Sequence, residues 1–524
     1  MAVHRWKRKE IRRMSEVLVW VKTAVRLCMS EFETDEEERD NFAKMEQLYN
    51  QYTDAEQRQI RKIIKTQFEV NDKIYIFSVL AQRMEIEDFQ GDFMESILEG
   101  SFDGYTGSML EWVSLVHVKG EYRRKRIFHK KNMEQFNKML GIDYPYLPIK
   151  QRNRKRIVIV AGQLLNILHA PTRVLLNIAY VLQECFGYEV LLFICPSNAG
   201  LPADLCLQTS RENVYKDFDD MPIQITYREA EFKGYQISMT PWSHKEYSMM
   251  FWMIYVWNPM FVLDMNTANA VVGLAGKYTT LVLFPMSTAC PISEGEILIR
   301  NGRKEDIAEE EYIAMLGEHQ VQLFMEENFP VLVEASQSNF TREALGLPTA
   351  QFLVAVVGNR LEEEINKELI DVMKKILEET QNISFVMIGG YKEIKDYFVD
   401  EVFNGHVYEL GYCVDLVGVY KTLDLFLNPE RAGGGFSGGM ALYAGIPVVT
   451  LPECDVAYNC GEEWVVQNYD EMIKVVSRYV NDNDFYNEKV RQAQKYGETN
   501  VQERLVHYVE KLLEGIYKVL EERE

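Results

Sequence analysis

The sequence predicts an α/β protein with two Rossmann-like domains preceded by an all-α domain. Short apolar, β-branched segments alternate with helical stretches from residue 156 to about residue 291, and again from residue 352. This alternation is typical of parallel strands joined by helices. Before residue 140 the apolar residues recur only at helical spacing. A chain of 524 residues also exceeds the size at which one core stops growing, roughly 250 to 300 residues. We therefore expect about three domains, at residues 1–148, 149–338 and 339–524.

The N-terminal part is predicted to be helical from residue 15 to about residue 140. Val17, Val21 and Cys28 lie on one helix face, and a second helix is expected near Thr53, which can cap it. Two basic clusters, residues 123–131 and 150–156, flank a proline-containing linker. We interpret the clusters as a solvated face, the alternative being contact with an anionic acceptor, lipid headgroups or a protein partner.

The first α/β domain is expected to open with a strand at residues 157–162. A helix at 172–185 and a strand at 189–195 complete a βαβ unit. The apolar stretch 247–263 contains Asn258 and Pro259 and is marginal for crossing a bilayer, so we interpret it as a helix, a proline turn and a buried strand. A helix at 268–278 and a strand at 280–284 follow.

The second α/β domain is expected to begin with a strand at residue 352. The pattern then predicts, in chain order, a helix at 364–379, a strand at 383–388, a helix at 416–421, a strand at 423–427, a helix at 440–444, a strand at 447–451 and a helical tail from residue 469.

Composition excludes several classes of protein. The formal net charge of -22 argues against a nucleic-acid binder, because phosphate neutralisation needs a basic surface. The eight cysteines show neither CxxC pairs nor metal-type spacing, which favours a reducing, cytoplasmic setting. The basic N-terminus is not expected to be a signal peptide, and no transmembrane segment is expected.

A glycine-rich segment carries the main functional prediction. Gly433, Gly434, Gly435, Gly438 and Gly439 follow a predicted strand and precede a predicted helix. Their amides would then lie at the carboxyl edge of a parallel sheet and at a helix N-terminus, where anions bind. The alternative is a purely structural loop that needs several residues with positive φ.

Charged and polar neighbours favour a diphosphate as the ligand of this segment. Arg431 adds a permanent positive charge and Ser437 a hydroxyl. We expect the diphosphate to lie between these two side chains and the loop amides, which include those of Phe436 and Gly438.

The segment FLNPERAGGGFSGGMALYAGIPVVTL resembles the diphosphate-binding region of O-GlcNAc-transferase-like protein glycosyltransferases. VAVVGNRLEEEINKEL resembles the first strand and loop of the donor domain in the large retaining (group 1/4) families. Both belong to the GT-B superfamily, and the resemblance covers residue 156 to the C-terminus. It implies that Asn359 and Arg360 contact the donor phosphates and that Lys367 loosely matches a second cation.

The resemblance also implies an acidic residue that binds ribose, but Met440 occupies that position. Glu430, Glu453 and Asp455 are the candidates to replace it in contacting ribose or sugar. Asp455 is the best placed of them, with a turn or cap role as its alternative.

The strand-to-helix loop of the first domain is expected to face the acceptor. His169 is a candidate base, and Gly162, Thr172 and Arg173 are candidate acceptor-side residues. For His169 the alternative is a hydrogen-bonded loop histidine, and for Arg173 a surface arginine. The DxD at Asp482 follows no predicted strand, so we expect no metal site and a metal-independent reaction.

The leading hypothesis is a metal-independent, hexosyltransferase-like enzyme. It would move a sugar from a nucleotide-diphosphate donor, most readily a UDP-sugar, to a hydroxyl of a protein or glycan. No other cofactor is expected, and the helical domain would hold a protein partner or the acceptor. The alternatives are a non-catalytic GT-B subunit that binds a glycosyltransferase or its substrate protein, and a nucleotide-sugar epimerase.

Overall fold

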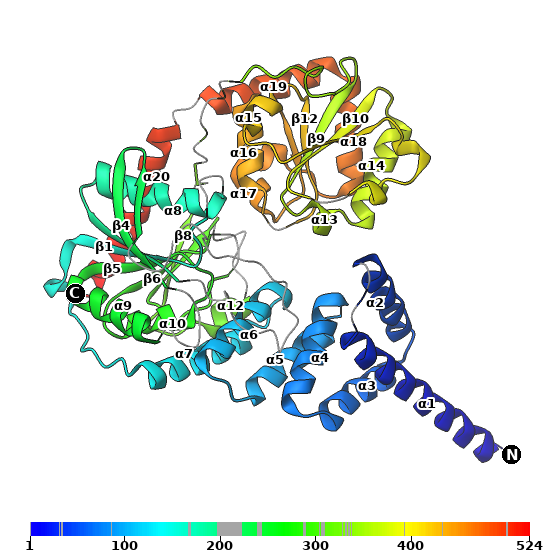
Figure 1. Ribbon diagram of the computed structural model, residues 1–524, viewed down its shortest axis with the longest axis horizontal. Coiled ribbons are helices and arrows are strands. Elements are labelled where there is room, and N and C mark those ends of the chain that lie inside the picture. Colours follow the sequence, from blue (N-terminus) through cyan, green and yellow to red (C-terminus); the bar gives the residue numbers. More distant parts are fainter. Residues whose placement is uncertain are drawn as a thin grey trace.

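The computed structural model describes residues 2–30, 32, 35–84, 86–165, 169–195, 223–237, 244–286, 290–302, 304, 310–326, 329–330, 333, 336, 338–391, 394–431, 433–498 and 501–524. Within these residues the chain forms a helical region and two α/β parts, each built on its own sheet (Figure 1).

The helical region packs as an all-α unit, as predicted. Its core contains Trp20, Phe77 and Phe89, all buried. Glu56 accepts a hydrogen bond from the Thr53 backbone N–H (2.9 Å), which fixes the start of the third helix at the predicted cap. The helices are α1 (Ala2–Cys28), α2 (Asp35–Asn50), α3 (Asp54–Gln67), α4 (Val70–Arg83), α5 (Glu87–Glu99), α6 (Gly104–His117) and α7 (Tyr122–Leu140).

Part of the basic cluster at residues 123–131 is buried, so its interpretation as a solvated face is wrong for three side chains. Lys125, Arg126 and His129 lie on the inner face of α7. Arg126 Nε donates to Glu294 of the first α/β part (2.5 Å), and Lys125 Nζ donates to the Val118 carbonyl (2.6 Å). The cluster therefore joins the helical region to the first sheet.

The first sheet has the strand order β3-β4-β2-β1-β5-β6-β7-β8. All neighbouring strands are parallel except β3 and β4, which form an antiparallel pair. The strands are β1 (Asn153–Ala161), β2 (Glu189–Ile194), β3 (Ile223–Tyr227), β4 (Ala230–Gln236), β5 (Pro259–Asp264), β6 (Leu281–Leu283), β7 (Ile297–Asn301) and β8 (Val321–Met325). The predicted strands appear, and β3, β4, β7 and β8 are additional.

Helices cover both faces of this sheet, as the alternating pattern predicts. The stretch at 247–263 forms a helix and a strand, as predicted, with the turn at Asn258 in the left-handed region (φ 51°). The helical elements are α8 (Ala170–Tyr180), η2 (Val181–Cys185), α9 (His244–Trp257), α10 (Ala270–Gly273), η3 (Leu274–Lys277) and α12 (Glu310–Met315). No helix in the described ranges is long and apolar enough to cross a membrane.

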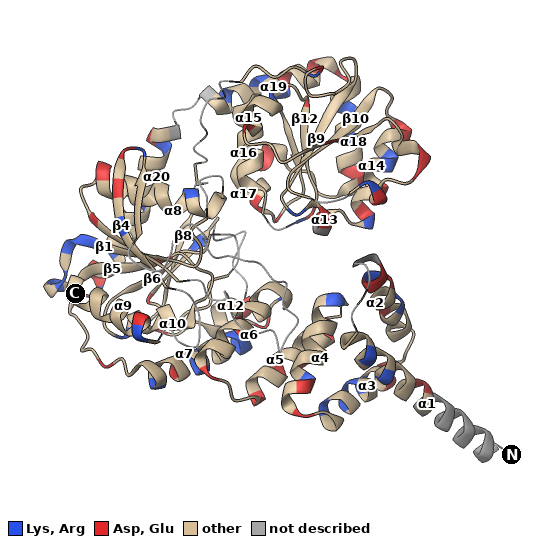
Figure 2. Cartoon of the chain, in the orientation of Figure 1, with Lys and Arg blue, Asp and Glu red and all other residues tan. Residues whose placement is uncertain are grey.

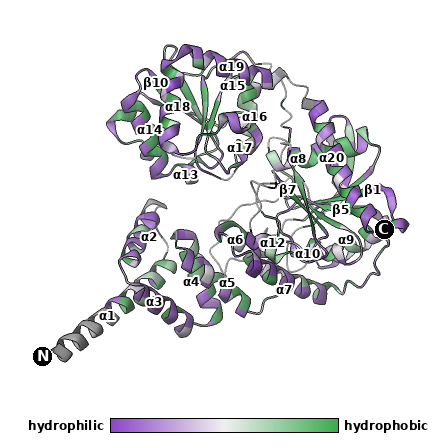
Figure 3. Ribbon diagram, turned by 180° about the vertical axis from the view of Figure 1, so that it is seen from behind, coloured by the Kyte–Doolittle hydropathy of each residue, from purple (hydrophilic) through white to green (hydrophobic). Residues whose placement is uncertain are grey.

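The second sheet has the fully parallel order β11-β10-β9-β12-β13. Its strands carry almost no charge, whereas Lys, Arg, Asp and Glu lie on the surrounding helices and loops (Figure 2). The hydropathy colouring shows the same separation (Figure 3). The strands are β9 (Phe352–Val357), β10 (Ile383–Ile388), β11 (Val407–Gly411), β12 (Leu425–Asn428) and β13 (Val448–Thr450).

The predicted helices of the second part are present with two changed boundaries, and α13 and α17 are additional. The helix predicted at 364–379 begins at Lys367, because the Asn366 side chain caps it. The helix predicted at 440–444 begins at Gly435, inside the glycine-rich segment. The helical elements are α13 (Leu361–Glu364), α14 (Lys367–Glu379), η4 (Lys395–Tyr397), η5 (Glu401–Phe403), α15 (Leu416–Tyr420), α16 (Gly435–Tyr443), α17 (Asp455–Cys460), η6 (Glu462–Trp464), α18 (Tyr469–Asn481) and α19 (Asn483–Glu498).

The last helix, α20 (Val501–Glu522), returns to the first sheet (Figure 1). Leu505, Tyr508, Leu512 and Ile516 are buried in the same core as β1 and β5. The predicted domain boundaries placed all the C-terminal helices in the second domain. In the structure, α20 packs against the sheet of the first domain instead. The reason is its apolar face, which is buried against the first sheet.

Candidate functional site

The two sheets share one connectivity. When the strands of the second sheet are numbered from 1 in chain order, their order across the sheet is 3-2-1-4-5. The first sheet has the same order over β4-β2-β1-β5-β6, if the antiparallel β3 is left out of the numbering. The order reverses between β9 and β12 and between β1 and β5. Ligands of such sheets bind in the crevice at the carboxyl ends of these strands. The predicted site residues follow β1 in the first sheet and β9, β12 and β13 in the second.

Two glycines shape the loop after β12. Gly433 (φ 98°) and Gly434 (φ 84°) lie in the left-handed region that side chains disfavour, and Gly434 is the N-cap of α16. The backbone N–H groups of Gly435, Phe436 and the half-buried Ser437 then belong to the first turn of α16, which leaves them without intrahelical acceptors. The loop therefore presents amides at a helix N-terminus, as predicted.

Gly435 and Gly438 allow close packing between α16 and α17. A Cβ on Gly435 would lie 2.1 Å from Asn459 Nδ2, and one on Gly438 would lie 2.8 Å from Cys460 Sγ, both on α17. The Gly438 N–H donates to the Gly434 carbonyl (3.1 Å), so this amide is already used within α16. Gly438 supports the loop through close packing, and its predicted contact with phosphate is not favoured by this geometry.

Arg431 is buried beside the loop, a position that does not favour its predicted contact with the diphosphate. Its Nε donates to Asn428 Oδ1 (2.8 Å), Nη1 to Glu364 Oε2 (2.6 Å) and Nη2 to the Val357 carbonyl (2.6 Å). The side chain is 3% exposed. Each guanidinium nitrogen thus has a protein acceptor, and Arg431 ties β9, β12 and α13 together.

Glu364 is a site residue that the sequence did not reveal. Its carboxylate is 11% exposed and is shared between Arg431 and Arg360, whose Nε donates to Glu364 Oε1 (3.1 Å). Arg360 is 38% exposed, and its Nη2 lies 3.4 Å from where a Gly433 Cβ would be. Arg360 is therefore the arginine that borders the open side of the loop. The spacing of four residues between Arg360 and Glu364 could have predicted this ion pair from the sequence.

The remaining donor-side candidates surround this loop. Asn359 is exposed after β9, and Glu430 is exposed after β12, where its N–H donates to the Tyr469 hydroxyl (3.2 Å). Asp455 begins α17, and its carbonyl oxygen would lie 2.8 Å from a Gly435 Cβ. Met440 packs against the apolar core of the second sheet.

His169 and Thr172 lie together at the start of α8. His169 Nδ1 is 3.0 Å from Thr172 Oγ1, which also accepts a hydrogen bond from the Leu165 N–H (2.8 Å). Burial lowers the pKa of His169 to about 4, so its ring is neutral at pH 7. Thr172 is buried and orders the loop, which leaves His169 as the residue with acid–base capacity there.

Arg173 joins the two predicted halves of the site. Its guanidinium carbon lies 5.4 Å from the centre of the Phe436 ring, a cation–π contact between α8 of the first domain and the first turn of α16. Phe436 also packs against the core of the first domain. The glycine loop and the edge of the first sheet therefore face one another.

Asp264, the last residue of β5, and Asn266, which follows this strand, were not identified as site residues from the sequence. A Cβ on Gly162 would lie 2.3 Å from Asn266 Oδ1, so the glycine is needed for the close approach of this side chain. Burial raises the pKa of Asp264 to about 7, although hydrogen bonds from Asn266 and the charge of His129 oppose this shift. The sequence feature that could have identified this pair is the position of two polar residues directly after the apolar run of β5.

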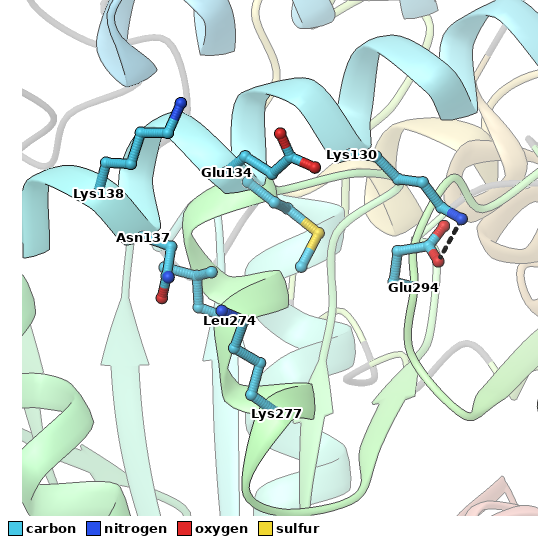
Figure 4. A pocket seen from close by; sticks show the side chains of 8 residues that line it. Lys130, Glu134, Asn137, Lys138, Leu274, Lys277 and Glu294 are labelled. Atoms are coloured by element: carbon cyan, nitrogen blue, oxygen red, sulfur yellow. Dashed lines mark ion pairs between the residues drawn. The ribbon is translucent and has the colours of Figure 1, made fainter. Parts of the chain in front are cut away.

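A groove of about 330 Å³ lies elsewhere, between α7 and η3 (Figure 4). It is lined by Lys130, Met133, Glu134, Asn137, Lys138, Leu274, Lys277 and Glu294. Lys130 forms an ion pair with Glu294 (3.0 Å). In the part of the chain that the structure describes, no group of three or more His, Cys, Asp or Glu side chains could hold a metal ion.

Comparison with known proteins identifies the fold. No protein-family model matches the sequence, and a search of curated proteins found no significant match. A solved structure of a mutant Thermobaculum terrenum O-GlcNAc transferase is similar over 98% of this chain and 99% of its own, with a TM-score of 0.56 and 13% identity. The Anabaena protein HepE in complex with UDP covers 69% of this chain and 100% of its own, with a TM-score of 0.47 and 13% identity. The first likeness confirms the predicted fold, including the helical region.

Proposed function

Starting from the GT-B fold, we propose that this chain is a glycosyltransferase that moves a sugar from a UDP-sugar to a hydroxyl of a protein or glycan. One observation carries the proposal. At the switch point of the second sheet, Arg360 and the first-turn amides of α16 border one loop, and Arg173 of the first domain faces it. Positive groups from both domains converge where a diphosphate would leave.

In this proposal the two arginines near the glycine loop have different roles. Arg360, on the open side, would donate to the diphosphate together with the amides of Gly435, Phe436 and Ser437. Arg431 would hold the loop in place from below. Met440 packs against the apolar core and cannot bind ribose through a carboxylate. Asp455 lies beside the first turn of α16 and is our candidate for the ribose contact. No metal ion is needed in this scheme.

Replacing Arg360 by alanine is expected to weaken UDP binding by about 10- to 100-fold, because a charged hydrogen bond contributes roughly 1.5 to 3 kcal/mol. The midpoint of thermal unfolding should change little, since the side chain is partly exposed. Calorimetric titration with UDP checks this. The control is Lys474→Ala, which removes one charge from an exposed position on α18. Wild-type protein that fails to bind UDP at millimolar concentration would refute the proposal.

The pH dependence of transfer tests His169 as the base. Burial lowers its pKa to about 4, so the neutral, proton-accepting form persists well below pH 6.5. The acidic limb of kcat/KM should therefore fall near pH 4, and His169→Gln should lower kcat while leaving the dissociation constant of UDP unchanged. A limb near pH 6.5 that survives His169→Gln would assign the base to another group.

A non-catalytic subunit is the second candidate, and Met440 is the observation that favours it. An apolar side chain stands where the resemblance implies an acid that binds ribose. Such a subunit would support the activity of a partner glycosyltransferase even after Arg360→Ala. An enzyme would lose its own transfer activity with that change, so one variant separates the two functions.

A further inference from the structure

The loop between β5 and α10 is held rigidly at the switch point of the first sheet. Met265 N–H donates to the Val160 carbonyl (2.7 Å), and Asn269 Nδ2 donates to the Cys195 carbonyl (3.2 Å). The Thr267 carbonyl accepts from the Ile292 N–H (2.8 Å). The loop is thus tied to the ends of β1 and β2 and to the segment before β7. Asn266 lies in the middle of this loop and is half-buried.

Asp264 determines which end of the Asn266 amide faces outward. Asn266 Nδ2 donates to Asp264 Oδ1 (2.5 Å), and this oxygen can accept whether the carboxyl group is ionised or carries its proton on Oδ2. Asn266 Oδ1 then points away from Asp264 and lies over Gly162. Among the residues that the structure describes, no donor to Asn266 Oδ1 is present. The site thus presents a hydrogen-bond acceptor of fixed orientation.

We propose that Asn266, oriented by Asp264 over Gly162, accepts a hydrogen bond from the hydroxyl-bearing substrate that receives the sugar. This inference rests on the proposed function, and it adds the residue that recognises the substrate. A carbonyl oxygen accepts from an O–H or N–H group and repels an anion, so this position suits the hydroxyl of the proposed substrate better than an anionic group. His169 and Arg173 follow β1 at the same edge of the sheet. An amide cannot remove a proton, so Asn266 binds and His169 remains the candidate base.

Asn266→Ala removes the acceptor oxygen, and Gly162→Ala displaces it while leaving the Asn266–Asp264 pair chemically intact. Asn153→Ala is the matched control, because Asn153 lies at the opposite end of β1, where its Oδ1 accepts from the Lys155 N–H. Binding of N-acetylserine amide and methyl glucoside is measured by saturation-transfer NMR, with and without UDP. UDP affinity is measured in parallel by calorimetry.

We expect wild type and Asn153→Ala to bind at least one probe, and Asn266→Ala and Gly162→Ala to bind it about 10-fold more weakly, which corresponds to one lost hydrogen bond. UDP affinity should be equal in all four proteins. Equal probe affinity in wild type and both site variants would overturn the inference, as would wild-type protein that binds UDP but neither probe. Failure to bind UDP would count against the proposed function instead, and the titrations without UDP still decide the role of Asn266.

Discussion

Replacing Arg431 by alanine should destabilise the second domain as well as abolish UDP binding. The side chain is almost fully buried and donates to three acceptors on β9, β12 and α13. Its removal leaves the Asn428 and Val357 oxygens without their donor, and losing one partner of a buried ion pair costs about 3 to 5 kcal/mol. Thermal and denaturant unfolding measure the stability, and calorimetry measures UDP binding.

Two further variants separate support of the loop from direct contact with the ligand. Arg431→Lys retains the charge but lacks the planar guanidinium group with which Arg431 reaches three acceptors. We therefore expect an intermediate loss of stability. Arg360→Ala should weaken UDP binding without this loss. If Arg431→Ala kept the wild-type unfolding midpoint and lost only UDP affinity, Arg431 would contact the diphosphate directly, as its position in the sequence had suggested.

Replacing Asp264 by asparagine should stabilise the protein at alkaline pH. Burial raises the pKa of Asp264 to about 7 in the folded state, whereas an unfolded aspartate titrates near about 4. Between these values the folded state binds more protons, so stability falls as pH rises through this window. Asparagine keeps the shape and cannot ionise. At pH 8 the free energy of unfolding should rise by up to about 4 kcal/mol, from about 1.4 kcal/mol for each unit of the shift.

The same comparison at low pH is the control. Below about pH 4 both residues are neutral, so wild type and Asp264→Asn should unfold at nearly the same temperature. A stability gain of equal size at pH 4 and pH 8 would show that the effect arises from packing and not from the charge. A loss of stability at pH 8 would show that the ionised carboxylate is satisfied by its neighbours, among them His129.

Local patterns predicted much of the fold because each acts over a few residues. The apolar runs identified β9 and β10, and the capping residue Thr53 identified the start of α3. The glycine cluster located the loop. The alternation of apolar runs with helices predicted parallel strands in two domains, and the two sheets are parallel apart from the β3–β4 pair.

Contacts between distant segments could not be predicted in this way. Gly433 and Gly435 look alike in sequence, yet the first provides a positive φ and the second admits the side chain of Asn459. The role of Arg431 depends on Glu364, which is 67 residues away in the chain. β7 and β8 were missed because the segments between them carry no clear helical pattern.

The return of α20 to the first sheet makes the second α/β unit an insertion in the first. The chain enters the inserted unit before β9 and leaves it after α19, so two covalent connections join it to the rest of the molecule. Two connections restrict the movement of the second unit relative to the first more than a single connection would. They favour rotation of the second unit about the line through the two connections over separation of the units. The apolar face of α20 is also part of the first core, so this core is complete only when α20 is packed against the sheet. The native core around the segment that begins at residue 153 therefore includes contacts with residues more than 340 positions later, and such distant contacts slow folding.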